Sequence, residues 1–308
     1  FFGSDGHIRR DADVVATLVE AARSDPRLGE VVATIDDIPA GFGAFGVLLA
    51  GQTHSRSDIV VKVNAQPIER AWLTALDLVD PGVVPHVVAQ GDVLAALPLG
   101  WLAMERLGHQ PPGMGAAEWY PPLLRGTDRW QAAAVSIDDL PVVETIDDAW
   151  ISRWLDVALA DSADAHLRRL RDRFQEDWAW VVDQCPVVPC HGDVHFFNAG
   201  SRSGSADEPL VLFDPIPRLA PWAYDAANTQ ALTNYHRFAD GRPSLVEQAA
   251  VLRGARGLDV PDGPTMQRVS ALLCAWLAVC WSVWFSQVAP ELRGTAMDYV
   301  KRAVAIDR

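Results

Sequence analysis

One short polar loop, His191–Asn198 (HGDVHFFN), places a carboxylate and an amide five residues apart, at Asp193 and Asn198. A second carboxylate, Asp214, ends an apolar run sixteen residues after Asn198. Phosphoryl transfer requires a base for the hydroxyl proton, oxygen ligands for a metal ion and cations on the phosphates. Asp193 can be the base, and Asn198 and Asp214 offer the oxygen atoms that Mg²⁺ prefers. The set predicts a phosphotransfer site.

Each of these features alone also has a structural explanation. HGDVHFFN is typical of a polar turn between strands, and Asp214 is typical of a cap at a strand end. The loop, a polar turn (SRSGSADE) and the second Asp occur in an order that a hairpin would bring together. This joint pattern favours the functional interpretation.

A cation for the phosphates is present upstream at Lys62, inside the apolar run DIVVKV. A lysine between valines is either a charge on an edge strand or a phosphate ligand, and the downstream loop favours the ligand. Glu69 begins the next helical segment and is predicted to pair with Lys62. Its structural alternative is an acid that complements the helix dipole.

Gly41 to Gly46 (GFGAFG) matches the pattern G-x-G-x-x-G, which dinucleotide-binding folds share with kinase phosphate loops. A dinucleotide fold would continue at once into a helix, whereas strand-like runs follow here. We therefore expect a hairpin that covers phosphates, with Gly43 and Gly46 as its binding glycines.

The elements that must position these residues change character along the chain. Residues 8–23 have helical spacing, and residues 31–63 contain three β-type runs typical of an antiparallel meander. A helix is predicted over residues 67–78. Further strands are predicted for VVPHVVAQ, VLAAL and WLAMERL.

Residues 111–115 (PPGMG) break this regularity, and we place the lobe boundary just before them. Residues 145–184 are predicted to be mainly helical, followed by the run VVPC, the polar loop and the run PLVLFD, with helices again to the end. The prediction is an α+β chain with a β-rich N-lobe at 1–107 and a larger helical C-lobe at 108–308.

The loop also has the form H-G-D-x-H-x-x-N, and VLFDPIPRLAPWAYDAAN adds an apolar strand ending in Asp214 and a further Asp-x-Ala at Asp225. These segments resemble the aminoglycoside phosphotransferase and choline-kinase-like superfamily, relatives of the protein kinases. The resemblance is strong over residues 185–228 and looser elsewhere. Asp214–Pro215 is similar to the streptomycin 6-phosphotransferase branch, but Ala220–Pro221–Trp222 stands where that branch usually has Gly-Asp-Pro.

The resemblance implies a bilobal protein-kinase-like fold and a role for each matching residue. It assigns Asp193 and His191 to catalysis, and Asn198 and Asp214 to the metal ion. Lys62, Glu69, Gly43 and Gly46 would serve the nucleotide. Met104 to Gly108 is similar to the family's hinge, where backbone groups of Glu105 and Leu107 would bind the adenine. The implied cofactors are ATP, with GTP as the other nucleotide, and Mg²⁺.

Composition narrows the partners. The chain has 308 residues, 49% of them apolar, and 26 basic against 40 acidic residues give a formal charge of −14. Such a field repels nucleic acid and anionic membranes and favours cationic small molecules. The four cysteines match no zinc spacing. The uncharged stretch 269–290 is long enough to span a bilayer, but its serines and central tryptophans favour a buried core helix.

These observations predict a cytoplasmic kinase that transfers the γ-phosphate of ATP to a hydroxyl group of a small polar, cationic molecule such as an aminoglycoside-type antibiotic. A kinase of a primary metabolite (a choline-like alcohol, a sugar or an amino-acid alcohol) and an inactive kinase-like binding module are the alternatives. We expect a monomer or homodimer. Trp222 and Tyr224 are the aromatic candidates for contact with a cation.

Overall fold

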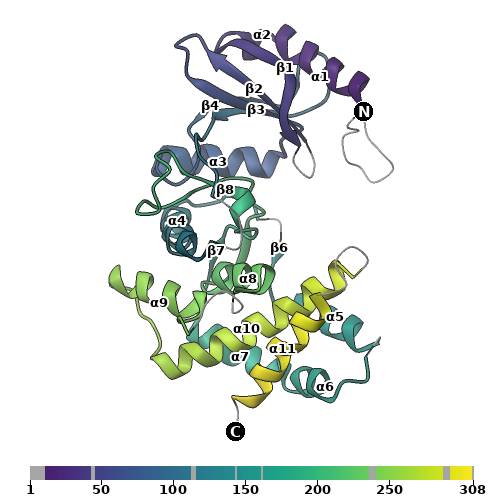
Figure 1. Cartoon of the computed structure of the whole chain (residues 1–308), viewed down its shortest axis with the longest axis vertical. Helices are drawn as coiled ribbons and strands as arrows, with labels where there is room; N and C mark the ends of the chain where they lie inside the picture. Colours follow the sequence, from purple (N-terminus) through teal and green to yellow (C-terminus); the bar gives the residue numbers. More distant parts are fainter. Residues whose placement is uncertain are drawn as a thin grey trace. The chain divides into compact units, whose positions relative to one another are not determined.

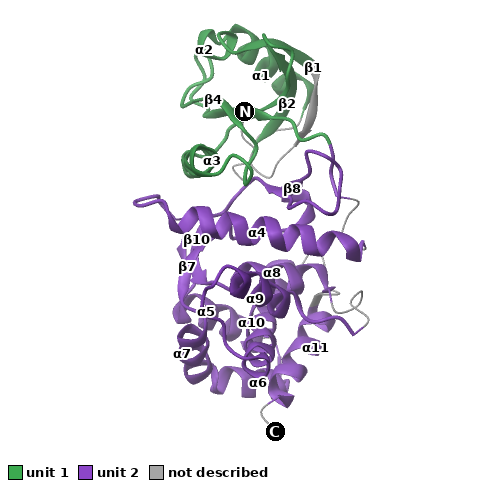
Figure 2. Ribbon diagram, turned by 90° about the vertical axis from the view of Figure 1, so that its left-hand side faces the viewer, with its two compact units in different colours: residues 1–108 green, residues 109–308 purple. Residues whose placement is uncertain are grey.

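The computed structural model describes residues 11–42, 46–111, 116–142, 144–160, 162–235, 241–286 and 292–306. The chain divides into two compact units, Phe1–Gly108 and His109–Arg308, which Figure 2 shows in green and purple. Each unit has its own secondary structure and its own buried side chains.

Unit 1 is built on a five-stranded antiparallel sheet with the strand order β1-β2-β3-β5-β4 (Figure 1). The strands are β1 (Val32–Phe42), β2 (Val47–Thr53), β3 (Asp58–Val63), β4 (Val87–Gly91) and β5 (Trp101–Glu105). The helices are α1 (Ala12–Ser24), α2 (Pro26–Gly29) and α3 (Pro67–Val79). The predicted meander and both predicted helices are present.

One predicted strand is wrong. The run VLAAL at residues 93–97 forms a turn, in which Leu94 and Leu97 pair with each other and Ala95 adopts a left-handed φ of 51°. Five residues with few β-branched side chains do not sustain a strand where the chain has to reverse between β4 and β5.

Alternate side chains of strand β3 point to the apolar core and to the opposite face of the sheet. Ile59, Val61 and Val63 join the apolar core that α1 and the sheet share. Because successive side chains of a strand point to opposite faces, Lys62 faces the other side. Figure 1 shows α3 on that side of the sheet and α1 on the first.

Unit 2 is mainly helical. Its helices are α4 (Tyr120–Val135), α5 (Asp148–Ala160), α6 (Ala165–Asp172), α7 (Phe174–Gln184), α8 (Tyr224–Thr233), α9 (Leu245–Ala255), α10 (Gly263–Trp284) and α11 (Leu292–Ala305), with the 3₁₀ turns η1 (Ala117–Trp119) and η2 (Phe196–Asn198). Helix α10 packs against α5, α7, α8, α9 and α11 (Figure 1). It is long and apolar enough to cross a membrane, but 72% of its most apolar stretch is buried inside the protein. This burial agrees with the predicted core helix.

Short strands in unit 2 hold the polar loop. β7 (Val187–Cys190) pairs antiparallel with β10 (Arg218–Pro221), and β10 pairs parallel with β6 (Glu144–Thr145). β8 (Ala199–Gly200) and β9 (Val211–Leu212) form the predicted hairpin. The loop therefore leaves β7 and enters β8, and both of its ends are fixed by strand pairing.

All four cysteines lie in unit 2 and are buried free thiols: Cys185, Cys190, Cys274 and Cys280. Burial raises the pKa of each thiol, to about 12 for Cys185 and Cys274. A thiol becomes a nucleophile or metal ligand as the thiolate. These four side chains therefore serve packing in the folded unit.

Candidate active site

Lys62 and Glu69 are brought together in unit 1. Lys62 Nζ lies 2.7 Å from Glu69 Oε1, and the two side chains are 6% and 4% exposed. Glu69 stands in the first turn of α3, which begins at Pro67. Proline is suited to the first turn because its missing N–H would have no helical partner there. The three residues between β3 and α3 thus suffice to bring the Glu69 carboxylate to the Lys62 ammonium group.

Of the four residues predicted to bind the nucleotide through their backbone, the structure describes three: Gly46, Glu105 and Leu107. Gly43 lies outside the described residues. Gly46 is buried beside Val63, and a Cβ there would collide with the Val63 carbonyl oxygen. Glu105 ends β5, and its amide donates to the His86 carbonyl at 2.8 Å. Leu107 follows β5 and is partly exposed. The Glu105 amide is thus engaged within unit 1.

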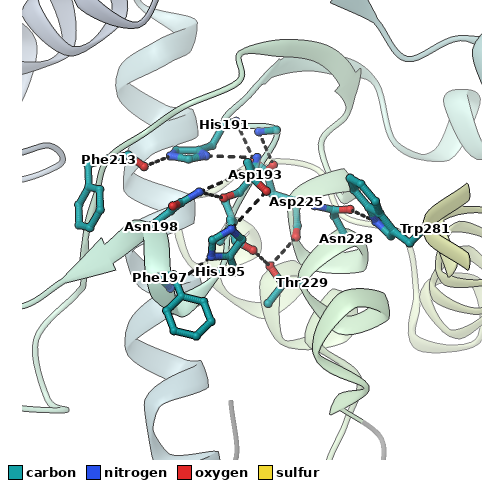
Figure 3. Close-up of polar contacts among 12 residues, drawn as sticks. His191, Asp193, His195, Phe197, Asn198, Phe213, Asp225, Asn228, Thr229 and Trp281 are labelled. Carbon is teal, nitrogen blue, oxygen red and sulfur yellow. Dashed lines mark hydrogen bonds and ion pairs between the residues drawn. The ribbon is translucent and has the colours of Figure 1, made fainter. Parts of the chain in front are cut away.

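In unit 2 the backbone of the polar loop is hydrogen-bonded to Asp225, which lies at the start of α8 (Figure 3). Its two carboxylate oxygens accept from the amides of His191 at 3.0 Å and Gly192 at 2.9 Å. Gly192 has φ +84°, and a Cβ there would collide with the Ile216 carbonyl oxygen. The second loop position therefore requires glycine.

Asp225 is fully buried, and burial raises its pKa to about 6 against the opposing effect of the Gly192 and His191 amides. Gln131 of α4 also donates to it, at 3.4 Å. Thr229, one turn later on α8, donates to the carbonyl of Val194 at 2.8 Å. Helix α8 thereby anchors the loop at two successive residues, His191 and Gly192, and again at Val194.

His191 is fully buried and braces the loop internally. Its Nδ1 accepts from the Asp193 amide at 3.3 Å, so the ring proton is on Nε2, which donates to the Phe213 carbonyl at 3.1 Å. Burial lowers the pKa of His191 to about 4, so the ring is neutral near pH 7. This placement links the loop to the segment that follows β9.

Asp193 presents a partly exposed carboxylate in the loop. Asn198 Nδ2 donates to Asp193 Oδ2 at 2.8 Å and to the Asp193 carbonyl at 3.0 Å. His195 Nε2 lies 3.4 Å from Asp193 Oδ1. Burial opposes ionisation, but His195 and Asn198 together hold the pKa of Asp193 below its ordinary value. The side chain is a carboxylate at neutral pH and can accept a hydroxyl hydrogen bond.

Asn198 and Asp214 are placed beside the same loop. The Asn198 carbonyl accepts from the Phe213 amide at 3.0 Å, and Asp214 follows directly with a left-handed φ of 56°. Against the larger lowering effect of burial, the charges of Asp193 and Asp214 both raise the pKa of His191. Because Asn198 Nδ2 is engaged by Asp193, its Oδ1 is the atom left to face a cation.

This donor set suits a hard ion. Asn198 and Asp214 offer amide and carboxylate oxygen, and Mg²⁺ is usually held by one or two protein oxygens, substrate phosphates and water. Among the described ranges, His, Cys, Asp and Glu form no group of three that would enclose a metal ion. The arrangement therefore fits an open magnesium site better than a closed zinc site.

The two aromatic candidates for cation contact are wrong for that role. Trp222 is 3% exposed and its ring is covered by the guanidinium of Arg253 at 5.1 Å. Tyr224 is 1% exposed inside α8. Both side chains pack in the interior, where they fix the start of α8 and therefore the position of Asp225.

Several supporting residues were not predicted as parts of the site. Asp225 stood in the sequence pattern, but its bonds to the loop amides depend on where α8 begins. His195 also stood in the pattern, without a role. Gln131 and Thr229 contact the site from α4 and α8. The four-residue spacing of Asp225 and Thr229 was a usable signal, because such residues share one helix face.

Comparisons with known proteins identify the fold. No known family's sequence profile and no curated protein matches the chain. Among solved structures, a putative fructosamine-3-kinase from Thermobifida fusca YX-ER1 matches with a TM-score of 0.59 and 18% identity, over 94% of this chain and 99% of that one. A choline/ethanolamine kinase family protein from Mesorhizobium loti matches with a TM-score of 0.57 and 13% identity, over 94% and 93%.

An aminoglycoside phosphotransferase from Alicyclobacillus acidocaldarius matches with a TM-score of 0.53 and 15% identity, over 91% of this chain and 92% of that one. At these identities the likeness establishes the fold. The chain has the protein-kinase-like fold of these proteins, with an antiparallel sheet in its N-terminal unit and a helical C-terminal unit. The predicted fold class is confirmed.

Proposed function

We propose that the chain is a small-molecule kinase that transfers the γ-phosphate of ATP to a hydroxyl group, with Asp193 as its base. The acceptor oxygen bonds to the γ-phosphorus while the bond to the β–γ bridging oxygen breaks. The hydroxyl proton passes to Asp193, and ADP leaves. The observation that carries this proposal is the ionised Asp193 carboxylate, held by Asn198 and His195 in a loop that α8 anchors.

The other residues have supporting roles in this proposal. Lys62, oriented by Glu69, would neutralise phosphate charge. Asn198 and Asp214 would hold Mg²⁺, which when bound stabilises the charge of the β- and γ-phosphates. Glu105 and Leu107 would contact the adenine edge through the Glu105 carbonyl and the Leu107 amide, and Gly43 and Gly46 would approach the phosphates. His191 would act from the interior as a brace rather than touch the substrate.

The acceptor class follows from charge. With a formal charge of −14, the protein favours a cationic acceptor, such as an aminoglycoside-type antibiotic. GTP is the alternative phosphate donor. A coupled assay of ADP release, run with antibiotics and with primary-metabolite alcohols, sugars and amino-acid alcohols, distinguishes the antibiotic kinase from the metabolite kinase.

Asp193→Ala tests the base directly. We expect a loss of roughly 10²- to 10⁴-fold in kcat for the acceptor, which is the usual contribution of a general base. Asp183→Asn, an exposed carboxylate at the end of α7, is the control and should leave kcat unchanged. An Asp193→Ala protein that phosphorylates its acceptor as fast as the wild type would show that the proposed mechanism is wrong.

The alternative of an inactive binding module rested on the atypical segment Ala220–Pro221–Trp222. Ala220 and Pro221 form regular β10 pairs with Val188 and Val187, and Trp222 is buried. This segment therefore belongs to the framework beneath the loop and favours no loss of activity. Calorimetry with Mg²⁺–ATP tests this alternative, because no binding at millimolar concentration together with a stable partner complex would favour the inactive module.

A further inference from the structure

His195 lies inside the polar loop and is engaged at both ring nitrogens (Figure 3). Its Nδ1 accepts from the Phe197 amide at 3.2 Å, and its Nε2 lies 3.4 Å from Asp193 Oδ1. A ring nitrogen that accepts from an N–H carries no proton itself. The proton of the neutral ring is therefore on Nε2, the atom that faces Asp193.

The Asp193 carboxylate is thereby held at both oxygens. Asn198 donates to Oδ2 at 2.8 Å, and His195 Nε2 lies 3.4 Å from Oδ1. Rotation of the carboxylate about its terminal bond would break both contacts at once. Each oxygen keeps a second lone pair, so the directions in which Asp193 can accept a further hydrogen bond are fixed.

The imidazole is itself held in position. The Phe197 ring contacts it edge to face, with 5.9 Å between ring centroids, and the His195 carbonyl accepts from the Asn198 amide at 3.0 Å. The side chain is 23% exposed. His166 differs, because it is 50% exposed and lies 3.4 Å from Asp164, whose oxygen already accepts from two helix amides. His195 is thus held by several contacts inside the loop, whereas His166 lies at the surface.

We propose that His195 is a positioning residue that donates from Nε2 to Asp193 Oδ1 and fixes the carboxylate in the orientation that accepts the acceptor's hydroxyl proton. This inference rests on the proposed function of Asp193. Its chemistry requires an N–H at the place of Nε2.

Two variants with side chains of similar length distinguish the effect of the hydrogen-bond donor from the effect of side-chain volume. His195→Gln keeps an N–H donor near the position of Nε2, and His195→Met has similar length without a donor. We expect His195→Met to lower kcat by about tenfold to hundredfold, as misorientation of a reacting group does. KM for ATP should stay within about twofold of the wild type, since the change leaves uniform binding of the nucleotide intact.

His195→Gln should recover most of that loss, and His166→Gln should match the wild type. The proposal is overturned if His195→Met is as active as the wild type, or if His195→Gln is as slow as His195→Met. Thermal unfolding of each variant identifies a change in folding, and a fall in kcat that follows a fall in Tm in both variants also counts against the proposal.

A second measurement does not depend on activity. Long-range proton–nitrogen NMR of the ¹⁵N-histidine-labelled protein, without substrates near pH 7.5, reports which nitrogen of each ring is protonated. The signal missing from His195→Gln belongs to His195, and we expect its Nε2 to carry a proton. A ring protonated at Nδ1 alone would reject the proposal.

The two hypotheses can fail separately. A wild-type protein that transfers phosphate to no acceptor would reject the proposed function, even if the NMR shows the expected ring form. A wild-type protein that does transfer phosphate, with a His195→Met variant equally fast, would reject only the role of His195.

Discussion

Lys62 and Asp193, the two charged side chains on which the proposed reaction depends, are held in different ways. In unit 1, Lys62 is oriented by a buried ion pair with Glu69 at 2.7 Å. In unit 2, Asp193 is oriented by side-chain contacts with Asn198 and His195, in a loop whose backbone is bonded to α8. Lys62 therefore depends on one interaction between opposite charges, whereas Asp193 depends on several weaker contacts.

The two arrangements should differ in how much free energy of unfolding is lost when one interacting side chain is removed. Removing one partner of a buried ion pair typically destabilises a protein by about 3–5 kcal/mol, because the other charge stays in the interior. Removing one neutral hydrogen bond costs about 1 kcal/mol. Unit 1 should therefore be sensitive to single changes at its pair, and the loop of unit 2 should tolerate single changes better.

The largest effect is expected at the ion pair. Lys62→Met should lower the free energy of unfolding by about 3–5 kcal/mol, because Glu69 then remains buried without its lysine. The double variant Lys62→Met/Glu69→Leu should recover stability but not activity. Arg171→Met is the matched control, since Arg171 contacts Asp156 at the same 2.7 Å on the surface. It should cost less than about 1 kcal/mol. Equal losses in chemical denaturation for Lys62→Met and Arg171→Met would contradict the comparison.

A pH-dependent effect of similar size is expected at His191. Burial lowers its folded-state pKa from 6.5 to about 4, so between these values the unfolded chain binds more protons than the folded chain. This contribution to stability is present above pH 6.5 and is lost as the pH falls through 4, by about 3 kcal/mol. His191→Gln should lack this loss. Denaturation curves at pH 4.5 and 7 for both proteins measure it, and parallel losses would refute it.

Asp225→Asn probes the anchor of the loop. An amide at this position places a second donor against one of the loop N–H groups, so we expect a loss of about 2 kcal/mol and a fall in kcat. The sign of its pH dependence is opposite to that of His191. Burial raises the pKa of Asp225 from 3.8 to about 6, so its contribution is present below pH 3.8 and is lost as the pH rises through 6. The variant should therefore differ more from the wild type at pH 5 than at pH 8. A constant difference would contradict this assignment.

The smallest effect is expected at Thr229. Thr229→Val removes the hydroxyl that donates to the Val194 carbonyl at 2.8 Å and should cost about 1 kcal/mol and a few-fold in kcat. Thr233→Val, one turn later, loses a hydroxyl that donates to the Thr229 carbonyl within the helix. We expect it to leave kcat unchanged. Equal kcat values for the two variants would show that Thr229 does not orient the loop.

Local patterns in the sequence predicted most elements of the fold, and the family resemblance supplied its kinase-like character. The β-type run DIVVKV predicted strand β3, and Pro67 predicted the start of α3. The predicted hairpin after the loop is present as β8 and β9. The failure at VLAAL has a physical cause, because a short apolar run has no period of its own and the neighbouring chain decides whether it becomes a strand.

The candidate site was predictable only at the level of residue types. The spacing within His191–Asn198 indicated a base and a metal ligand. It could not show that His191 points inward or that Asp225 accepts from two loop amides, since both depend on packing between segments far apart in the chain. The role assigned to Lys62 remains a prediction that the variants above can test, and the roles of Asn198 and Asp214 as metal ligands also remain predictions.

The burial of all four cysteines in unit 2 makes their thiols a chemical probe of that unit alone. A maleimide dye added to the native protein can modify a thiol only when the surrounding helices open. Since the first cysteine in the chain is Cys185, every modification event reports an opening of the C-terminal unit, and none reports the sheet that carries Lys62. The labelling rate thus gives the kinetic lifetime of one unit in the intact chain, without an engineered probe.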